Sequence, residues 1–312
     1  MNFRISGILL ALSLVFCSCQ KDHSAGSVTG TPVILNMGGV QTKAVSMGEN
    51  VDRVYYEVWD ESFSNRLFPT DSRSENFVPV EDNVAYVNLQ LLKGQIFNVI
   101  FWAQNSGCGV YSWDNLKDIN VDYSGFVSNN KDLYDAFYAV DQIVADGQYK
   151  EIYLYRPFAQ LNFGTGTLET SLGEFSIRSN RITVSKVAKT FNTVRGAANP
   201  DSYIEGGTFV ASEGGLVQQE KADRKDLEIG DDCYYWVAMN YLLVPSSQEA
   251  TVTVDAEFVT SGGKVSHSID NVPVRKNYRT NIIGELFTAQ GKFKVNVNPI
   301  FNGEYNHSDS AE

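Results

Sequence analysis

Apolar and polar residues alternate one by one along most of this chain, and that period of two constrains the fold more than any other feature. In "TVTVDAEF", residues 251–258, apolar side chains occupy every second position from Val252 onward, and "KFKVNVN", residues 292–298, repeats the pattern. Successive side chains of a strand point to opposite faces, so these runs predict half-buried antiparallel strands. Many short strands separated by turn residues favour an all-β protein built from antiparallel β-sandwiches.

The same alternation places side chains inward near both ends of the chain. A first strand is expected at "PVILNM", residues 32–37, and a last one at "FKVNVN", residues 293–298. The expected inward side chains are Val33, Leu35 and Met37 in the first strand and Phe293, Val295 and Val297 in the last. These two sets are the expected core-facing residues of the two terminal strands.

One segment departs from the period of two. Between Asp132 and Ala145, the apolar residues Leu133, Phe137 and Val140 lie near helical spacing, and Asp132 is a suitable N-cap. The sequence therefore predicts one short helical insertion in a protein that otherwise consists of strands.

A Gly/Thr-rich joint, "GTGT" at residues 164–167, divides the strand-rich part of the chain. The length of the chain favours two domains. We therefore expect an N-terminal sandwich over residues 31–166 and a C-terminal sandwich over residues 167–312.

The beginning of the chain is typical of a targeting signal. Arg4 precedes an apolar run that is too short to span a bilayer, and this run leads into "FCSCQKDH". Small Ser18 precedes Cys19 and polar residues follow it, so the stretch resembles a bacterial lipoprotein signal. We expect residues 1–18 to be removed, Cys19 to be lipidated and residues 19–30 to form a flexible tether. A plain signal peptide or a membrane anchor is the alternative.

Charge and cysteine content exclude some partners. The net charge of −12 becomes −13 once Arg4 is lost with the signal. An acidic protein lacks the basic face that nucleic acid binding needs, and it has no polybasic patch for membranes. Cys108 and Cys233 fall in different expected domains, so we expect both to be unpaired.

Catalytic motifs are absent from the sequence. The three histidines are His23 in the expected tether, His307 in the polar C-terminal tail, and His267, which is the one placed among the expected strands. There is no HExxH, paired CxxC or P-loop, and the loop carboxylates Asp231 and Asp232 are too few for a calcium site. We therefore expect no enzyme activity, metal or cofactor, although a pair of facing carboxylates in a hydrolase stays open as an alternative.

Two tryptophans offer a possible sugar-binding surface. Trp102 and Trp113 of "SWDN" could form an aromatic platform for a glycan, or Trp102 could instead pack beneath a loop.

Longer motifs carry a family resemblance. "YLYRPFAQLNFGT" (residues 153–165), "NVPVRKNYRTNIIGELFT" (271–288) and the terminal "FKVNVNPIF" resemble fimbrillin-type proteins. "FWAQN" and "DAFYA" resemble blocks of an uncharacterised fimbrillin-like family within that group. Fimbrillins are lipoprotein pilins and accessory subunits of type V pili of Gram-negative gut and oral bacteria. The resemblance implies two transthyretin-like β-sandwich domains, a lipid anchor at the outer membrane and a place at the cell surface.

The resemblance also implies a mode of assembly. In that family, proteolysis removes the first strand, and a strand from another subunit fills the groove by β-augmentation. The resemblance implies that the core-facing residues of the two terminal strands are the donor or groove residues, namely Val33, Leu35, Met37, Phe293, Val295 and Val297. The matching place here is "VQTKAVS", where Lys43 stands in the position of the expected arginine. A trypsin-like protease could cut there, whereas an arginine-specific one would leave the chain intact and anchored.

The leading hypothesis is thus a structural, accessory or anchor subunit of a surface pilus, or an adhesin. Its expected partners are outer-membrane lipid through Cys19, other pilus subunits, and a host protein or glycan. The alternative is a stand-alone surface lipoprotein that binds glycans.

Overall fold

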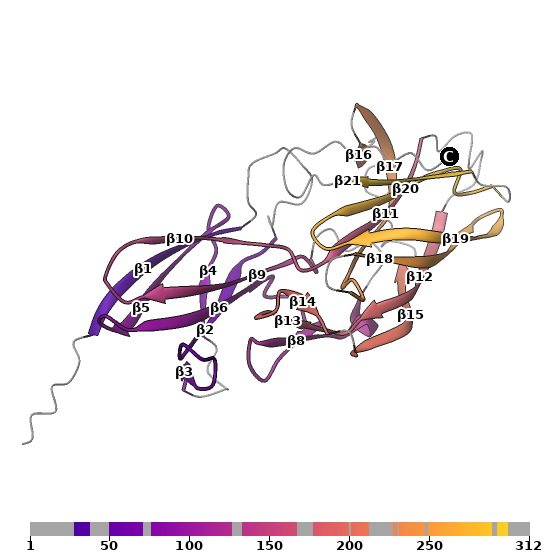
Figure 1. Ribbon diagram of the computed structural model, residues 1–312. Helices are drawn as coiled ribbons and strands as arrows, with labels where there is room; N and C mark the ends of the chain where they lie inside the picture. The colour runs from indigo at the N-terminus through magenta and orange to yellow at the C-terminus, as the bar shows by residue number, and fades with distance from the viewer. Residues whose placement is uncertain are drawn as a thin grey trace, which may run out of the picture.

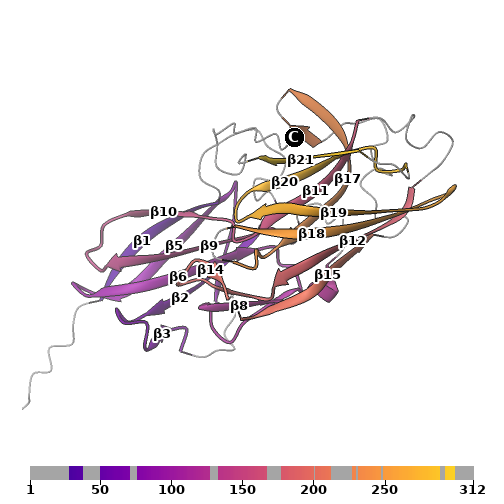
Figure 2. The same ribbon diagram turned by 45° about the vertical axis from the view of Figure 1, so that its right-hand side comes forward.

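The computed structural model describes residues 28–37, 50–70, 76–126, 133–166, 177–199, 201–211, 227–229, 231–246, 249–288 and 292–298. Within these ranges the chain is almost entirely β-structure, with one 3₁₀ turn, η1 (Tyr123–Gly125), and no α-helix. The all-β prediction is confirmed, and the sheets pack in layers as expected of β-sandwiches (Figures 1 and 2).

Strands from the first half of the chain form two sheets. Sheet A has the order β10-β1-β5, and sheet B has the order β3-β2-β6-β9, with β4 also pairing with β2. Their bounds are β1 Val28–Met37, β2 Arg53–Trp59, β3 Arg66–Phe68, β4 Phe77–Pro79, β5 Val84–Leu92, β6 Ile96–Gln104, β9 Ala136–Val144 and β10 Lys150–Leu154. Figure 1 shows the strands of these sheets together at one end of the molecule.

Sheets A and B bury one hydrophobic cluster between them. On the side of sheet A, β5 alternates strictly, with Ala85, Val87, Leu89 and Leu91 buried and the residues between them exposed. Sheet B contributes residues from β2, β6 and β9, including Val54 and Phe101, to the same cluster. The period of two in the sequence therefore corresponds to one buried face and one solvent face.

Strands from the second half form two further sheets. Sheet D has the order β15-β12-β18-β19, and sheet E has the order β16-β17-β11-β20-β21. Their bounds are β11 Ala159–Thr165, β12 Ile177–Ala188, β15 Tyr203–Ala211, β16 Leu227–Ile229, β17 Asp232–Leu242, β18 Glu249–Thr260, β19 Gly263–Arg275, β20 Arg279–Gly284 and β21 Phe293–Asn298. Most pairings are antiparallel, but β1 with β10 and β11 with β20 are parallel.

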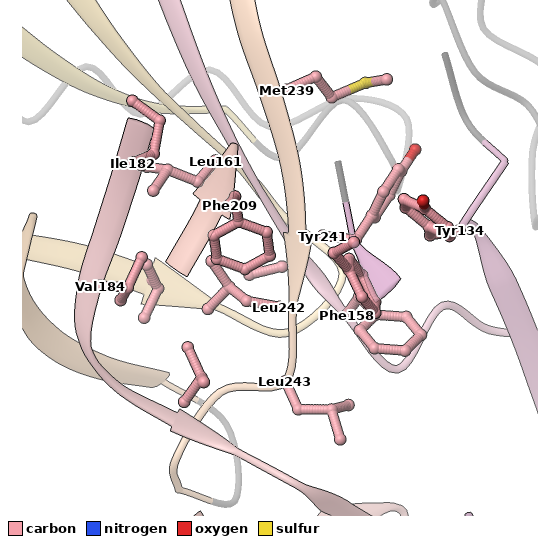
Figure 3. Packing of buried hydrophobic residues seen from close by; sticks show 14 of the residues in the cluster. Tyr134, Phe158, Leu161, Ile182, Val184, Phe209, Met239, Tyr241, Leu242 and Leu243 are labelled. Carbon is pink, nitrogen blue, oxygen red and sulfur yellow. The ribbon is translucent and has the colours of Figure 1, made fainter. Parts of the chain in front are cut away.

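The second hydrophobic cluster fills the space between sheets D and E and extends to residues 110–126 and to one face of sheet B. Figure 3 shows Phe209 of β15 within this cluster, close to Leu161 of β11 and Leu242 of β17. All three side chains are fully buried. β18 and β19 form a hairpin, and Gly263, the first residue of β19, adopts φ 135°.

A small sheet C links the two halves of the chain. It has the order β14-β13-β8-β7, with bounds Ala197–Ala198, Thr190–Asn192, Asp118–Val121 and Tyr111–Ser112. Phe191 of β13 pairs with Ile119 of β8, and both side chains belong to the second cluster. Residues near 110–120 thus pack with the later half of the chain.

The helix predicted between Asp132 and Ala145 is wrong. Residues 136–144 form β9, which pairs with β6 along its whole length from Ala136 to Val144. Aromatic and β-branched residues fill this segment and favour a pleated surface. Phe137, Ala139 and Ile143 face the core with the period of a strand, so packing against β6 outweighs a helical spacing of only three residues.

Sheet membership changes between β10 and β11. β10 ends at Leu154 and pairs with β1, whereas β11 starts at Ala159 and lies between β17 and β20. The domain boundary near residue 166 stays a prediction.

Candidate functional site

The first strand of the described chain, β1, occupies the middle of sheet A. It pairs antiparallel with β5 from Val28 to Asn36 and parallel with β10 from Val33 to Met37. The second half of β1 therefore has backbone partners on both sides, and it fills a groove whose walls are β5 and β10 (Figure 1).

The inward side chains of β1 close the first hydrophobic cluster. Val33 and Leu35 are 1% and 0% exposed, and they lie in register with Val87 and Ala85 of β5. Burying two such side chains contributes about 3–6 kcal/mol as an upper estimate. An empty groove would expose this apolar surface to water. The backbone of Met37 pairs with Leu154, but its side chain lies outside the described residues.

One inward residue of β1 fits the groove poorly. Thr31 is 1% exposed, and its Oγ1 atom has no hydrogen-bond partner. An unsatisfied buried hydroxyl costs about 1–3 kcal/mol. A strand with an apolar residue at this register would therefore bind the groove more tightly than β1 does.

A proline lies within β1 where it does little harm. Pro32 is opposite Asn88 of β5, and the pairing with β10 begins only at the next residue. Proline lacks an amide proton, so it is tolerated where one edge of a strand has no partner. β1 is thus doubly paired only after Pro32.

A buried ion pair fixes the chain just after β10, which forms one wall of the groove. Arg156 follows β10, and its Nε and Nη2 atoms lie 2.5 Å from the two carboxylate oxygens of Asp135, just before β9. Both side chains are almost fully buried, and the guanidinium lies 4.5 Å from the Phe137 ring centroid. A two-pronged contact of this kind satisfies both charges and sets the direction of the chain. The arginine in "YLYRPF" is therefore structural.

The rest of that motif also has a structural role. Asn162 of β11 donates to Asn281 of β20 at 2.8 Å, and its Oδ1 atom accepts from Trp236 of β17 at 3.2 Å. These side chains bridge three adjacent strands of sheet E. Further along the chain, Asn277 adopts φ 63° in the turn before β20, and its backbone N–H donates to the carbonyl of Phe158.

Several predicted site residues lie outside or apart from this groove. Cys19 and Lys43 lie outside the described residues. Phe293, Val295 and Val297 belong to β21 at the edge of sheet E and are half-buried, with Phe293 and Val295 packed against the second cluster. The structure does not bring them near β1.

Of the two roles left open for Trp102, the structure excludes the sugar platform, because the side chain is buried. Trp102 is 0% exposed, and its Nε1 donates to Gln104 at 2.8 Å. Trp113 is half-buried and packs edge-on against Tyr55 with ring centroids 5.0 Å apart. Trp102 is buried because sheet C covers the second face of β6, so its ring cannot stack on a sugar.

A group of exposed tyrosines lies elsewhere, on the outward face of sheet A and at the two ends of β10. Tyr149, Tyr153 and Tyr155 are 55%, 44% and 53% exposed, and Tyr86 of β5 is 68% exposed. The alternation in "YKEIYLY", residues 149–155, carries this pattern. The Tyr153 hydroxyl donates to Glu151 at 3.0 Å, and this bond together with the carboxylate charge raises the pKa of Tyr153.

A second, apolar groove borders the edge of β5 that faces away from β1. A cavity of about 430 Å³ lies between β5 and the strands β2, β3 and β6, lined in part by Tyr56, Phe68 and Leu91. In the described part of the chain β5 pairs only with β1 and a tight bridge at Val84. Sheets A and B are therefore open on this side.

The remaining chemical groups have packing roles. The Nε2 atom of His267 makes a 2.9 Å hydrogen bond with the Leu286 carbonyl, and its ring packs edge-on against Phe293. Cys108 is a buried free thiol, and burial raises its pKa to about 11. Among the described residues, no group of His, Cys, Asp or Glu side chains is placed to hold a metal ion.

A family profile matches residues 30–311, which is nearly the whole chain, and it describes a family of unknown function, DUF6562. The chain belongs to the DUF6562 family. No curated protein matches this DUF6562 chain in sequence. In the ranges that the structure describes, no helix is long and apolar enough to cross a membrane.

Several solved structures are similar to this one. A candidate cell adhesion protein from Bacteroides ovatus is 8% identical, with a TM-score of 0.50 over 87% of this chain and 98% of its own. One from Bacteroides uniformis is 12% identical, with a TM-score of 0.49 over 89% and 98%. The tip fimbrial protein Mfa3 from Porphyromonas gingivalis is 10% identical, with a TM-score of 0.48 over 87% and 99%. The fold is thus similar to that of the candidate cell adhesion protein from Bacteroides ovatus, while the family is DUF6562.

Proposed function

We propose that this protein is a cell-surface structural subunit of the adhesion or fimbrial type, and that its β1 strand can be exchanged for a strand of another subunit. The observation that carries the proposal is the position of β1 between β5 and β10. A single strand there completes both the hydrogen bonding of a sheet and the first hydrophobic cluster. Strand addition by another chain would replace both contributions.

Two further observations support the proposal, the first for the surface role and the second for strand exchange. The fold is shared with a candidate cell adhesion protein from Bacteroides ovatus over nearly all of that chain. The unsatisfied Thr31 hydroxyl leaves β1 less than optimally bound, which favours replacement by a better-matched strand.

Processing at Lys43 would decide which role the protein takes. Lys43 lies between β1 and β2, so a cut there frees β1 from the rest of the chain. An uncut chain keeps β1 in its groove and keeps a lipid on Cys19, and it acts as an anchor or a stand-alone surface protein. A cut chain needs a donor strand, because its first cluster is open.

Mass spectrometry of the mature N-terminus on cells tests this step. Lipid on Cys19 marks an anchored protein, and a free Ala44 marks a processed subunit. Purified precursor is treated in parallel with a trypsin-like protease, with Lys43→Gln as the matched control. Release of β1 and fibre formation only in the unsubstituted chain supports the subunit role, whereas cutting without loss of β1 contradicts exchange.

A peptide of residues 28–37 tests exchange directly. The cut protein is mixed with the labelled peptide and followed by native mass spectrometry. We expect a peptide with Thr31→Val to displace β1 more readily than the natural sequence. A peptide with Val33→Asp and Leu35→Asp is the control, because it keeps the backbone but cannot enter the cluster. Equal uptake of all three peptides would contradict the proposal.

Glycan binding is the second candidate function. Trp102 cannot support it, but the exposed tyrosines of sheet A can, and they favour a glycan as the partner in adhesion.

A further inference from the structure

We propose that the row of outward-facing tyrosines formed by β10 and the two residues that flank it, with Tyr86 of β5 beside it, binds an extended chain of uncharged sugars. This inference deepens the proposed adhesive function, on which it rests, by naming a surface and a class of ligand. The tyrosine row is defined here as Tyr149, Tyr153 and Tyr155.

The tyrosine row follows from the pleat of one strand. From Tyr149 to Tyr155, every second residue is exposed, and the residues between them are the half-buried Lys150 and the buried Ile152 and Leu154, which fill the first cluster. Residues two apart lie on one face about 6.7 Å from each other, so the row is about 20 Å long. Several consecutive sugar rings would lie along it.

Neighbouring strands widen the row into a face. Ile34 of β1 is in register with Glu151 of β10 on one side and with Tyr86 of β5 on the other. Ile34 is half-buried, whereas Glu151 and Tyr86 on its two sides are exposed, so the face is hollowed at Ile34. Partial desolvation, then the nearby Glu151 and Tyr86, raise the pKa of Tyr149, which agrees with the closeness of these groups.

Aromatic rings and hydrogen-bonding groups alternate on this face. The apolar C–H face of a pyranose carries slight positive charge and packs on the negative face of an aromatic ring. Glu151 lies between Tyr149 and Tyr153 and accepts a hydrogen bond from the Tyr153 hydroxyl, and further along β5 Asn88 and Gln90 are exposed. Carboxylate and amide oxygens accept hydrogen bonds from sugar hydroxyls, and the amide groups of Asn88 and Gln90 can also donate.

The charge of the face selects against anionic chains. Glu151 is the one formally charged side chain in the alternating run from Tyr149 to Tyr155 on this face, and the whole chain has a net charge of −12. Sulfated or uronic acid polymers would meet repulsion without a compensating cation. Uncharged polysaccharides meet no such penalty.

A glycan fits this face better than a protein does. The centre of a protein interface is usually apolar and desolvated, with polar groups at its rim. Here the order is reversed, because the carboxylate of Glu151 lies in the middle of the aromatic residues. Burying that carboxylate against a protein would require a matching cation, whereas sugar hydroxyls satisfy it individually.

Affinity electrophoresis tests the inference. The full chain is run through native gels that contain xylan, mannan or β-1,3-glucan, with heparin and polygalacturonate as anionic controls and poly-lysine as a cationic partner. Test variants are Tyr149→Ala with Tyr153→Ala, and separately Tyr86→Ala. The matched control is Tyr203→Ala, an exposed tyrosine of β15 in sheet D. Thermal unfolding confirms that each variant is folded.

We expect retardation by at least one uncharged polysaccharide, weakened about tenfold or more in the double variant and unchanged in Tyr203→Ala; tenfold corresponds to about 1.4 kcal/mol. Retardation that survives loss of the tyrosines would overturn the site, although adhesion through another surface would stand. Absence of retardation in every uncharged gel, or tyrosine-dependent binding of poly-lysine alone, would overturn the ligand class. The exchange assay with the residue 28–37 peptide is independent of all three outcomes.

Discussion

Replacing Leu35 by alanine is the most direct test of how β1 is held. Leu35 is 0% exposed and lies in register with Ala85 on one side and Ile152 on the other. Both neighbours are fixed by strand pairing, so the space left by the leucine cannot easily collapse. Substitutions of this kind cost about 2–5 kcal/mol, and we expect a value near the middle, about 3 kcal/mol.

Urea unfolding followed by tryptophan fluorescence measures this loss. With a slope of about 2–3 kcal/mol per molar urea, a loss of about 3 kcal/mol lowers the midpoint by roughly 1–1.5 M. The matched control is Ile34→Ala, one residue away on the opposite face, where the side chain is only half-buried. We expect the control to cost less than about 1.5 kcal/mol.

The register of β1 is tested by comparing the losses of stability in Leu35→Ala and Ile34→Ala. Because side chains alternate, a slip of β1 by one residue would exchange the environments of Ile34 and Leu35. Equal losses, or a larger loss for Ile34→Ala, would therefore refute the register described here.

Other substitutions and conditions give further checks. Thr31→Val removes the unsatisfied hydroxyl and should stabilise the protein by about 1 kcal/mol in the same urea assay. Asp135→Asn leaves the buried charge of Arg156 uncompensated and should cost about 3–5 kcal/mol, seen as a lower melting temperature, whereas an unchanged melting temperature would contradict the ion pair. Burial raises the pKa of Cys108 from 9.0 to about 11, so the native thiol should resist iodoacetamide at pH 8 and react readily in urea. Because the unfolded thiol ionises first, its contribution to stability should be lost as pH rises from about 9 to about 11.

The sequence is a good guide where one face of a strand is buried and the other is wet. β5 and β18 show this, because their alternation matches their burial residue by residue. It fails where a strand is buried on both faces. β6 is buried from Phe97 to Gln104, so its sequence gives no face on which Trp102 would be exposed.

The prediction of a helix between Asp132 and Ala145 is wrong for a related reason. Its helical spacing rested on three residues, and a long antiparallel pairing with β6 decides between the two periods. The alternation in "YKEIYLY" indicates that the tyrosine row lies on one face of a strand. A local pattern cannot show whether another element covers that face, so it does not predict that the tyrosines are exposed. The packing role of Arg156 likewise depends on Asp135, 21 residues earlier.

The parallel pairing of β1 and β10 also has a mechanical meaning. A pull on the chain ahead of Val28, directed along the strand, loads the hydrogen bonds to β5 and β10 in shear, so that they share the force instead of opening one by one. β10 passes the load toward Arg156, whose bond to Asp135 holds the corner, and from there into β11 at the centre of sheet E. Force applied to the first described strand is therefore carried by paired strands and a buried ion pair as far as the second hydrophobic cluster.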